Sequence, residues 1–166
     1  TQENAIKLRA RGFALIGPGK GYLASGREGV GRLEDTDKIL GTLRLILGRK
    51  GNLAGRKIVI TAGGTQEPID PVRVITNRSS GKMGYAIAEA ARDRGAEVAL
   101  ITAPSSLPAP VGAKIVPVNT AREMMEAVNK AVVGAYSLIM AAAVADYHVS
   151  SPAQKKIKKE SSGRLT

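Results

Sequence analysis

The residue types best suited to chemistry gather at positions 77–82, Asn-Arg-Ser-Ser-Gly-Lys, at the start of a predicted helix. Free backbone N–H groups and the positive end of the helix dipole favour a phosphate there, and Gly81 lets a ligand approach the backbone closely. The alternative is that Ser79 or Ser80 only caps the helix. The glycine pair Gly63-Gly64 is expected on the same rim, and this coincidence favours the anion site.

Three side chains are candidates for roles around such a phosphate. Asn77 carries a neutral amide that could orient a carbonyl or stabilise an oxyanion. Asp146 follows a predicted strand and could accept hydrogen bonds from ribose or base, or help hold a cation; its alternative role is a turn or helix cap. Lys156 lies in a dense basic run and could neutralise triphosphate charge, although a solvated charge run is the commoner explanation. His148 has no partner arranged for a triad or a metal cluster.

Two familiar phosphate-binding motifs are excluded by their spacing. The connection from Ala62 to Ser79 is too long for the tight turn of a dinucleotide fingerprint, and Gly63-Gly64-Thr65 does not complete G-x-G-x-x-G. The pair Gly81-Lys82 is followed by methionine where a Walker A motif needs Ser or Thr. A simple NAD site is therefore disfavoured.

Alternating strands and helices must position these residues. Consecutive β-branched residues before Gly63 read as a buried strand, and Thr120 with Glu123 forms a capping-box pattern that opens a helix. Gly95 is expected to stop the preceding helix. We predict strands at 57–61, 97–102, 114–118 and 136–143, and helices at 80–94 and 120–133. We expect the inward helix faces to carry Met83, Ile87 and Ala90, and then Met124, Val128 and Ala131.

This alternation predicts an α/β protein with a Rossmann-like, doubly wound and mainly parallel sheet. Ligands of such folds bind beyond the carboxyl ends of the strands, which places residues 63–64, the loop to Ser80 and residues 143–147 along one rim. No strand or helix pattern follows the lysine run, so we expect the sheet to be truncated at the C-terminus.

The first part of the chain has a different character. A glycine-rich basic stretch at 48–55 reads as a linker, with one domain before it and one after it. We expect a short strand at 14–16, a glycine-rich loop at 17–31, and a helix after a cap at Asp35 or Thr36. These elements cannot close a core by themselves.

Composition limits the class of partner. The net charge of +11 and the pI near 10.2 favour an anionic partner, but the basic residues are mostly dispersed and the aromatic share is only 3%. A phosphorylated metabolite is therefore expected rather than nucleic acid. The absence of cysteine excludes disulfides and thiolate metal sites, and the longest apolar stretch, at 138–145, is too short to span a bilayer. We expect a soluble cytoplasmic protein with no membrane partner.

Several long motifs resemble the bacterial phosphopantothenoylcysteine synthetase family from Gly55 onward. Residues 61–73 read Thr-Ala-Gly-Gly-Thr-Gln-Glu-Pro-Ile-Asp-Pro-Val-Arg, residues 76–84 read Thr-Asn-Arg-Ser-Ser-Gly-Lys-Met-Gly, and residues 141–147 and 156–159 follow as the two later motifs in the same order. The resemblance implies coenzyme A biosynthesis: ligation of 4′-phosphopantothenate to L-cysteine with CTP and a divalent cation such as Mg²⁺. It also implies an acyl-cytidylate intermediate, release of CMP and pyrophosphate, and a homodimer or higher homo-oligomer.

Site residues carry over by motif. Asn77 corresponds to the asparagine that supports turnover of the acyl intermediate, and Lys156 to the first lysine of K-x-K-K, which supports formation of that intermediate. Residues 140–142 (Met-Ala-Ala) and Asp146 match nucleotide-binding positions. The ligands of the metal stay unknown.

The segment before the linker resembles the tail of the decarboxylase usually fused upstream of this synthetase. The resemblance rests on Gly17-Pro18 and on residues 21–32, Gly-Tyr-Leu-Ala-Ser-Gly-Arg-Glu-Gly-Val-Gly-Arg. We therefore expect residues 1–50 to be this tail and linker, and residues 51–166 to be the nucleotide-binding part of the ligase. Ser25 stands where much of that family has a catalytic cysteine, and serine is a far weaker acid. FMN would belong only to the missing decarboxylase portion.

Two other classes stay open on the residues alone. An NAD(P)-binding Rossmann oxidoreductase shares the predicted sheet but lacks the fingerprint. A non-catalytic basic binding module would show a steep salt dependence of nucleic-acid affinity and no response to CTP.

Overall fold

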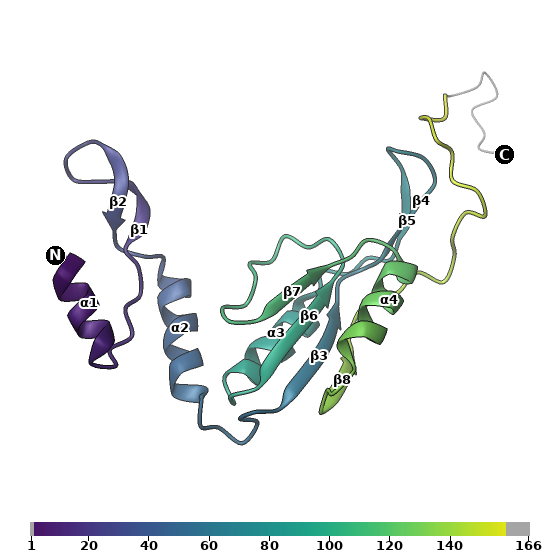
Figure 1. Cartoon of the computed structure of the whole chain (residues 1–166). Coiled ribbons are helices and arrows are strands. Elements are labelled where there is room, and N and C mark those ends of the chain that lie inside the picture. Colours follow the sequence, from purple (N-terminus) through teal and green to yellow (C-terminus); the bar gives the residue numbers. More distant parts are fainter. Residues whose placement is uncertain (1, 159–166) are drawn as a thin grey trace. The chain divides into compact units, whose positions relative to one another are not determined.

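A computed structural model describes residues 2–158 of the chain (Figure 1). The chain divides into two compact units, Thr1–Leu47 and Gly48–Thr166. None of the helices among the described residues is both long and apolar enough to cross a membrane.

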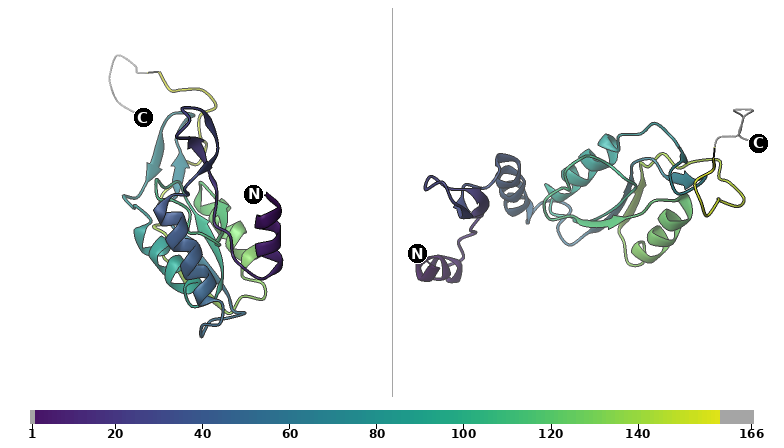
Figure 2. Two further views of the ribbon diagram at one scale, coloured as in Figure 1. Left: turned by 90° about the vertical axis from the view of Figure 1, so that its left-hand side faces the viewer. Right: turned by 90° about the horizontal axis from the view of Figure 1, so that it is seen from above.

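The second unit is built on a four-stranded parallel sheet, as predicted. The strand order is β7-β6-β3-β8. The strands are β3 (Lys57–Ala62), β6 (Glu97–Thr102), β7 (Lys114–Pro117) and β8 (Ser137–Met140), and the helices are α3 (Lys82–Arg92) and α4 (Ala121–Ala131). In the view from above, α3 in teal and α4 in green lie on opposite sides of the sheet (Figure 2). The predicted Rossmann-like α/β class is confirmed.

Alternation along β3 divides the core into two layers. Ile58, Ile60 and Ala62 pack with residues of α3, whereas Val59 packs with residues of α4. Successive side chains of a strand point to opposite faces, so a continuous apolar run is what a strand covered on both sides requires. The parallel pairing of β3 with both β6 and β8 places this strand at the centre of the sheet.

The predicted buried face of α3 was right for Ile87, which is half-buried and packs against the core, and wrong for Met83 and Ala90. Met83 is 65% exposed and Ala90 is exposed, while the buried residues are Gly84, Tyr85, Ala88, Ala91 and Arg92. The reason is a close approach of the helix to β3: a Cβ at Gly84 would lie 2.6 Å from Cβ of Ala62. Only the stripe of small residues permits that approach, and the larger Met83 side chain is turned to solvent.

The helix ends follow the predicted signals closely. Thr120 Oγ1 accepts from the N–H of Glu123 at 3.1 Å, and Glu123 Oε2 accepts from the N–H of Asn119 at 2.6 Å. The capping box therefore forms, with its return bond one residue earlier than the usual pattern. Met124 and Val128 are buried as predicted. Gly95, with φ of +91°, follows the end of α3.

Two differences concern the segments between the main elements. The long connection after β3 contains a small antiparallel hairpin, β4 (Gln66–Pro68) and β5 (Val74–Thr76), which we did not predict. The last strand, β8, is shorter than the predicted 136–143. Its continuation is instead a single bridge between Gly64 and Ala143.

The first unit also departs from the prediction. It contains α1 (Gln2–Ala10), β1 (Gly19–Tyr22), β2 (Glu28–Arg32) and α2 (Thr36–Gly48), and residues 14–16 form no strand. The glycine-rich segment taken for a loop is an antiparallel hairpin, closed by a turn in which the N–H of Leu23 donates to Arg27 O at 2.8 Å. Glycine weakens a strand, so its frequency concealed the pairing. The predicted α2 is confirmed.

Candidate active site

The strand order places the switch point of the sheet between β3 and β8. The chain runs from β3 through β6 to β7 on one side and then returns to place β8 on the other side of β3. This reversal is the topological switch point, and ligands of open α/β sheets bind there, outside the carboxyl ends of the strands. The segments after β3 and β8 meet at this rim: the N–H of Ala143 donates to Gly63 O at 2.8 Å, and the N–H of Thr65 to Ala143 O at 3.2 Å.

Two fully buried threonines hold the segment that follows β8, which comprises residues 141–145. Thr61 Oγ1 accepts from the N–H groups of Ala141 and Ala142 at 3.1 and 3.2 Å. Thr65 Oγ1 accepts from the N–H of Ala145 at 2.8 Å. Both threonines are 0% exposed. Residues 141 and 142, which the resemblance assigns to nucleotide binding, therefore belong to a backbone segment with a defined orientation.

Asn77 lies on the same rim. Its Nδ2 donates to Val144 O at 2.9 Å, and its own carbonyl lies close to Gly64, where a Cβ would be 2.7 Å from Asn77 O. Any side chain at Gly64 would push the two segments apart. The structure thus brings Asn77 together with the glycine pair, as the sequence led us to expect, and fixes one hydrogen of its amide.

The remaining phosphate candidates surround Gly81. Gly81 is the N-cap of α3, with φ of +75°, and its position next to Gly63 leaves 3.2 Å between a Cβ placed there and Gly63 N. Ser79 Oγ accepts from the N–H of Gly81 at 3.3 Å and Ser80 Oγ from the N–H of Lys82 at 3.4 Å. Neither serine is the N-cap. Bonds of this length are weak, so a phosphate oxygen can replace them at low cost.

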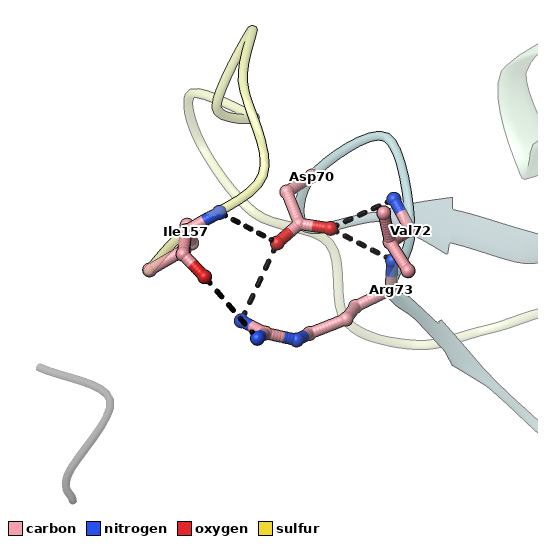
Figure 3. Close-up of polar contacts among 4 residues, drawn as sticks. All are labelled: Asp70, Val72, Arg73 and Ile157. Atoms are coloured by element: carbon pink, nitrogen blue, oxygen red, sulfur yellow. Dashed lines mark hydrogen bonds and ion pairs between the residues drawn. The ribbon is translucent and has the colours of Figure 1, made fainter. Parts of the chain in front are cut away.

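Lys156 lies at a different place on the molecule. Its neighbour Ile157 is held at the turn of the β4–β5 hairpin, which is the end far from Asn77. There it joins Asp70, Val72 and Arg73 in a cluster of four residues that we call the clasp (Figure 3). The side chain of Lys156 is exposed, and among the described residues no hydrogen bond or ion pair joins it to the rim. Lys159, the last lysine of the run, lies outside the described residues. The structure therefore does not bring Lys156 together with Asn77 in one chain.

The clasp is built around Asp70, whose side chain is 0% exposed. One carboxylate oxygen accepts from the N–H groups of Val72 and Arg73, both at 2.8 Å, and the other accepts from the N–H of Ile157 at 3.1 Å. Arg73 Nη1 lies 3.3 Å from the second oxygen, and its Nη2 donates to Ile157 O at 3.2 Å. A buried carboxylate with these partners joins the lysine segment to the hairpin.

Opposing effects act on the pKa of Asp70. Burial acts to raise it, but the N–H groups of Val72, Ile157 and Arg73, together with the Arg73 charge, outweigh burial and hold the pKa below its ordinary value of 3.8. The carboxylate is therefore ionised at neutral pH, and the clasp is closed.

Glu67 occupies another possible anion site, the N-terminus of α4. Its Oε1 accepts from the N–H of Ala121 at 2.8 Å, so a carboxylate of the protein already lies at the N-terminus of α4. A cavity of about 530 Å³ adjoins this contact and is lined in part by His148. Sequence reasoning missed Glu67, Asp70, Thr61 and Thr65. The available signals were the Asp70-Pro71 turn and a polar Thr61 inside a β-branched run.

Comparison with known proteins places the chain in a family. The model for the DNA/pantothenate metabolism flavoprotein C-terminal domain matches residues 53–166. The coenzyme A biosynthesis bifunctional protein CoaBC of Mycobacterium tuberculosis (strain ATCC 25618 / H37Rv) is 45% identical over 171 residues, covering 100% of this chain and 41% of the relative. CoaBC of Escherichia coli (strain K12) is 47% identical over 160 residues, covering 96% and 39%. The chain thus spans about two fifths of the length of these curated relatives.

Solved structures agree with the sequence relatives. The crystal structure of a CoaBC C-terminal domain is 45% identical with a TM-score of 0.58, covering 64% of this chain and 56% of that one. The DNA/pantothenate metabolism flavoprotein from Streptococcus pneumoniae is 35% identical with a TM-score of 0.54, covering 57% and 42%. Because the family model covers more than half of its residues, the chain belongs to the DNA/pantothenate metabolism flavoprotein C-terminal domain family, and the resemblance read from its motifs is confirmed.

Proposed function

We propose that this chain is the nucleotide-binding part of a phosphopantothenate–cysteine ligase that acts in coenzyme A biosynthesis. The ligase joins 4′-phosphopantothenate to L-cysteine and consumes CTP. The observation that carries the proposal is the rim at the switch point, where Asn77, two glycines and the segment after β8 converge. The relatives that share this chain's sequence are named for coenzyme A biosynthesis, which supports the pathway.

The chemistry needs no nucleophile from the protein. In the first step a carboxylate oxygen of 4′-phosphopantothenate attacks the α-phosphorus of CTP, and the bond to pyrophosphate breaks. In the second step the cysteine amine attacks the acyl carbon, the bond to CMP breaks, and the nitrogen loses a proton. A carboxylate is a poor acyl donor, so the protein's task is to position the reactants and to stabilise developing charge.

Asn77 is suited to the second step. A carboxamide has two N–H donors, and one of them donates to Val144 O. This bond fixes the plane of the amide and leaves the second hydrogen for the acyl carbonyl, on which negative charge develops during attack by the amine. A donor held in place before the reaction costs no reorganisation.

The phosphates are assigned to the glycine rim and to the start of α3. Gly63, Gly64 and Gly81 permit close approach, and the hydroxyls of Ser79 and Ser80 lie beside the first N–H groups of the helix. Among residues 2–158 no group of three His, Cys, Asp or Glu could hold a metal ion. We therefore propose that Mg²⁺ binds through the triphosphate, with the exposed Asp146 as a supporting carboxylate, because Mg²⁺ commonly uses few protein ligands beside substrate phosphates.

For Lys156 we propose a role across a homodimer. Each hairpin strand has three residues, which separates the clasp from the Asn77 end by roughly 10 Å at about 3.3 Å per residue. In this proposal, the clasp presents Lys156 to the phosphates of a second copy rather than to its own rim. There the ammonium would stabilise the charge that forms on the phosphates during the first step.

Mixed dimers test this assignment in a full-length synthetase that carries these residues. Asn77→Ala and Lys156→Gln proteins are each expected to be nearly inactive. If the two residues reach one site from different protomers, random exchange restores about a quarter of the activity, because half of the dimers then hold one intact site. If both act from one protomer, exchange restores nothing, and the cross-dimer role is wrong.

For residues 1–50 we propose the tail of a flavoprotein decarboxylase with its linker, and for residues 51–166 the ligase part. Ser25 lies in the turn between β1 and β2. A serine there cannot replace the acidity of a thiol. We therefore propose no decarboxylation by this chain and assign FMN to the remainder of a bifunctional protein. An oxidoreductase is not favoured, since the rim lacks the dinucleotide fingerprint.

A melting scan with CTP and Mg²⁺ tests the nucleotide site. A ligand that binds only the folded protein stabilises it by about 2.7 kcal/mol at a hundredfold excess over Kd. This corresponds to a rise in Tm of about 5–10 °C for a chain of this size. Tripolyphosphate is the control, because a chain with net charge +11 attracts any polyanion. The same shift with tripolyphosphate, or none with CTP, would defeat the proposal.

A further inference from the structure

A single buried hydroxyl controls the orientation of two peptides at the rim. Thr61 is 0% exposed and follows Ile58, Val59 and Ile60 in β3, where a valine would fill the same volume. Its Oγ1 accepts hydrogen bonds from the N–H groups of both Ala141 and Ala142. The hydroxyl donates its own hydrogen to Sδ of Met140, at an Oγ1–Sδ distance of 4.0 Å. A hydroxyl has one hydrogen and two lone pairs, so its whole capacity is used on this one segment.

The consequence for the backbone follows from peptide geometry. In a trans peptide the N–H and the C=O point in opposite directions, and the only cis peptide among the described residues is Gly17-Pro18. The peptides 140–141 and 141–142 both direct N–H to Thr61, so the carbonyls of Met140 and Ala141 are directed away from β3. No described residue donates a hydrogen bond to the carbonyl of Ala141. This part of the rim therefore presents acceptors and no free donor.

We propose that Thr61 is a positioning residue that determines the class of nucleotide base accepted at this rim. By holding both N–H groups, it makes residues 140–141 a row of acceptors for an exocyclic amine, which cytosine and adenine carry. Uracil and hypoxanthine carry a carbonyl oxygen at the equivalent place, which would face a protein carbonyl. A site built to pair with a donor rejects an analogue that lacks it, because its polar groups are left unpaired. The inference rests on the nucleotide site proposed above.

Calorimetric titration of the chain with matched nucleotide pairs provides the test. We expect CTP to bind at least tenfold more tightly than UTP, and ATP at least tenfold more tightly than ITP. Thr61→Val keeps the volume and removes the hydroxyl, so it frees both N–H groups. Its affinity for CTP should fall about tenfold, which is the loss of one or two net hydrogen bonds, while UTP changes less. Thr61→Ser restores the hydroxyl and should recover most of the preference.

A matched control is available on the neighbouring strand. Thr102 in β6 is also buried, at 7% exposure, but its hydroxyl donates to Ala103 O at 2.8 Å and lies 3.3 Å from the hydroxyl of Tyr85. Thr102→Val makes the same chemical change without touching residues 140–142. It should lower Tm and leave the ratio of CTP to UTP affinity unchanged.

The outcomes separate this inference from the proposed function. If the unaltered chain binds CTP and UTP equally, Thr61 does not set base preference, although a nucleotide site exists. If Thr61→Val keeps the original ratio, the inference is overturned in the same way. If the unaltered chain binds no nucleotide, the proposed function fails first. Should Thr61→Val not fold, the two nucleotide pairs on the unaltered chain still decide, because equal affinities within each pair overturn the row of acceptors.

Discussion

Gly84 is a position where one added methyl group should disturb the packing of α3 against β3. Gly84 lies in α3, and a Cβ there would be 2.6 Å from Cβ of Ala62 and 2.8 Å from Thr61 O. Ordinary contacts begin near 3.4 Å, so Gly84→Ala forces α3 to retreat from β3 by 3.4 − 2.6 = 0.8 Å. The neighbouring atoms belong to backbone and Cβ, which cannot turn aside as the end of a long side chain can.

The magnitude follows from two losses and one gain of stability. Overpacking a close contact costs about 1–3 kcal/mol, and a backbone clash lies toward the upper end. A gap of about 0.5–1 Å also removes a quarter to a half of the dispersion energy of the contacts that it opens. Alanine in place of glycine in a helix returns about 1 kcal/mol. We expect a net loss of about 2 kcal/mol, or about 4–8 °C in Tm for a chain of this size.

Thermal melting followed by circular dichroism measures this loss, and Ala90→Gly is the control. Ala90 is exposed in the same helix, so its replacement changes helix propensity without a packing contact. Both variants should melt lower than the unaltered chain, although they change helix propensity in opposite directions. If Gly84→Ala instead melts higher by about the amount that Ala90→Gly melts lower, propensity alone acts, and the close approach of α3 to β3 is wrong.

Three further outcomes are expected. In a full-length synthetase, Lys156→Gln should suppress formation of the acyl-cytidylate. Asn77→Ala should slow consumption of the acyl-cytidylate roughly a hundredfold, so that this intermediate accumulates. Rapid-quench mass spectrometry with 4′-phosphopantothenate and CTP measures the intermediate, and the reverse pattern would contradict both roles. Because the pKa of Asp70 is lowered in the folded chain, its stabilisation is complete above the ordinary value of 3.8 and is lost as pH falls through the folded value. The amide NMR signal of Ile157 should report this opening, and Asp70→Asn should remove the pH step; an unchanged step would exclude Asp70. Thr120→Ala should lower the free energy of unfolding by about 1 kcal/mol and Thr120→Gly by only a few tenths, measured by urea titration; equal losses would contradict the cap.

The fold was predictable where local pattern and tertiary packing require the same residues. The strand at 97–102 was predicted with the bounds that β6 has. A strand covered on both faces needs a continuous apolar run, and the ends of the neighbouring helices are signalled by a glycine or a capping box. Each of these signals is local in the sequence. The capping bond of Thr120 spans only three residues and is written in the sequence for the same reason.

The prediction of the buried face of α3 from hydrophobicity failed where the helix lies close to the sheet, because small residues decide the packing there. The face of α3 was assigned by hydrophobicity to Met83, whereas Gly84 and Ala88 face the sheet because they are small. Hydrophobic periodicity does not report how near two elements come. The hairpin of β1 and β2 was missed on similar grounds, since glycine is depleted from strands on average and carries no apolar alternation.

For the candidate site, what could be predicted depended on how far apart in the sequence the contacting residues lie. The glycines and Asn77 stand in two motifs that a reader can join through the rule for parallel sheets. The bond from Ile157 to Asp70 joins residues 87 positions apart, and that from Ala142 to Thr61 joins residues 81 apart. No local pattern encodes such a pair. What the sequence does show is its cost: a hydroxyl or carboxylate placed where burial is expected must find partners, because an unpaired one costs about 1–3 kcal/mol. Thr61 within a run of isoleucine and valine is such a place: its type and position predict that its hydroxyl has a partner, and the folded chain supplies that partner from the segment after β8.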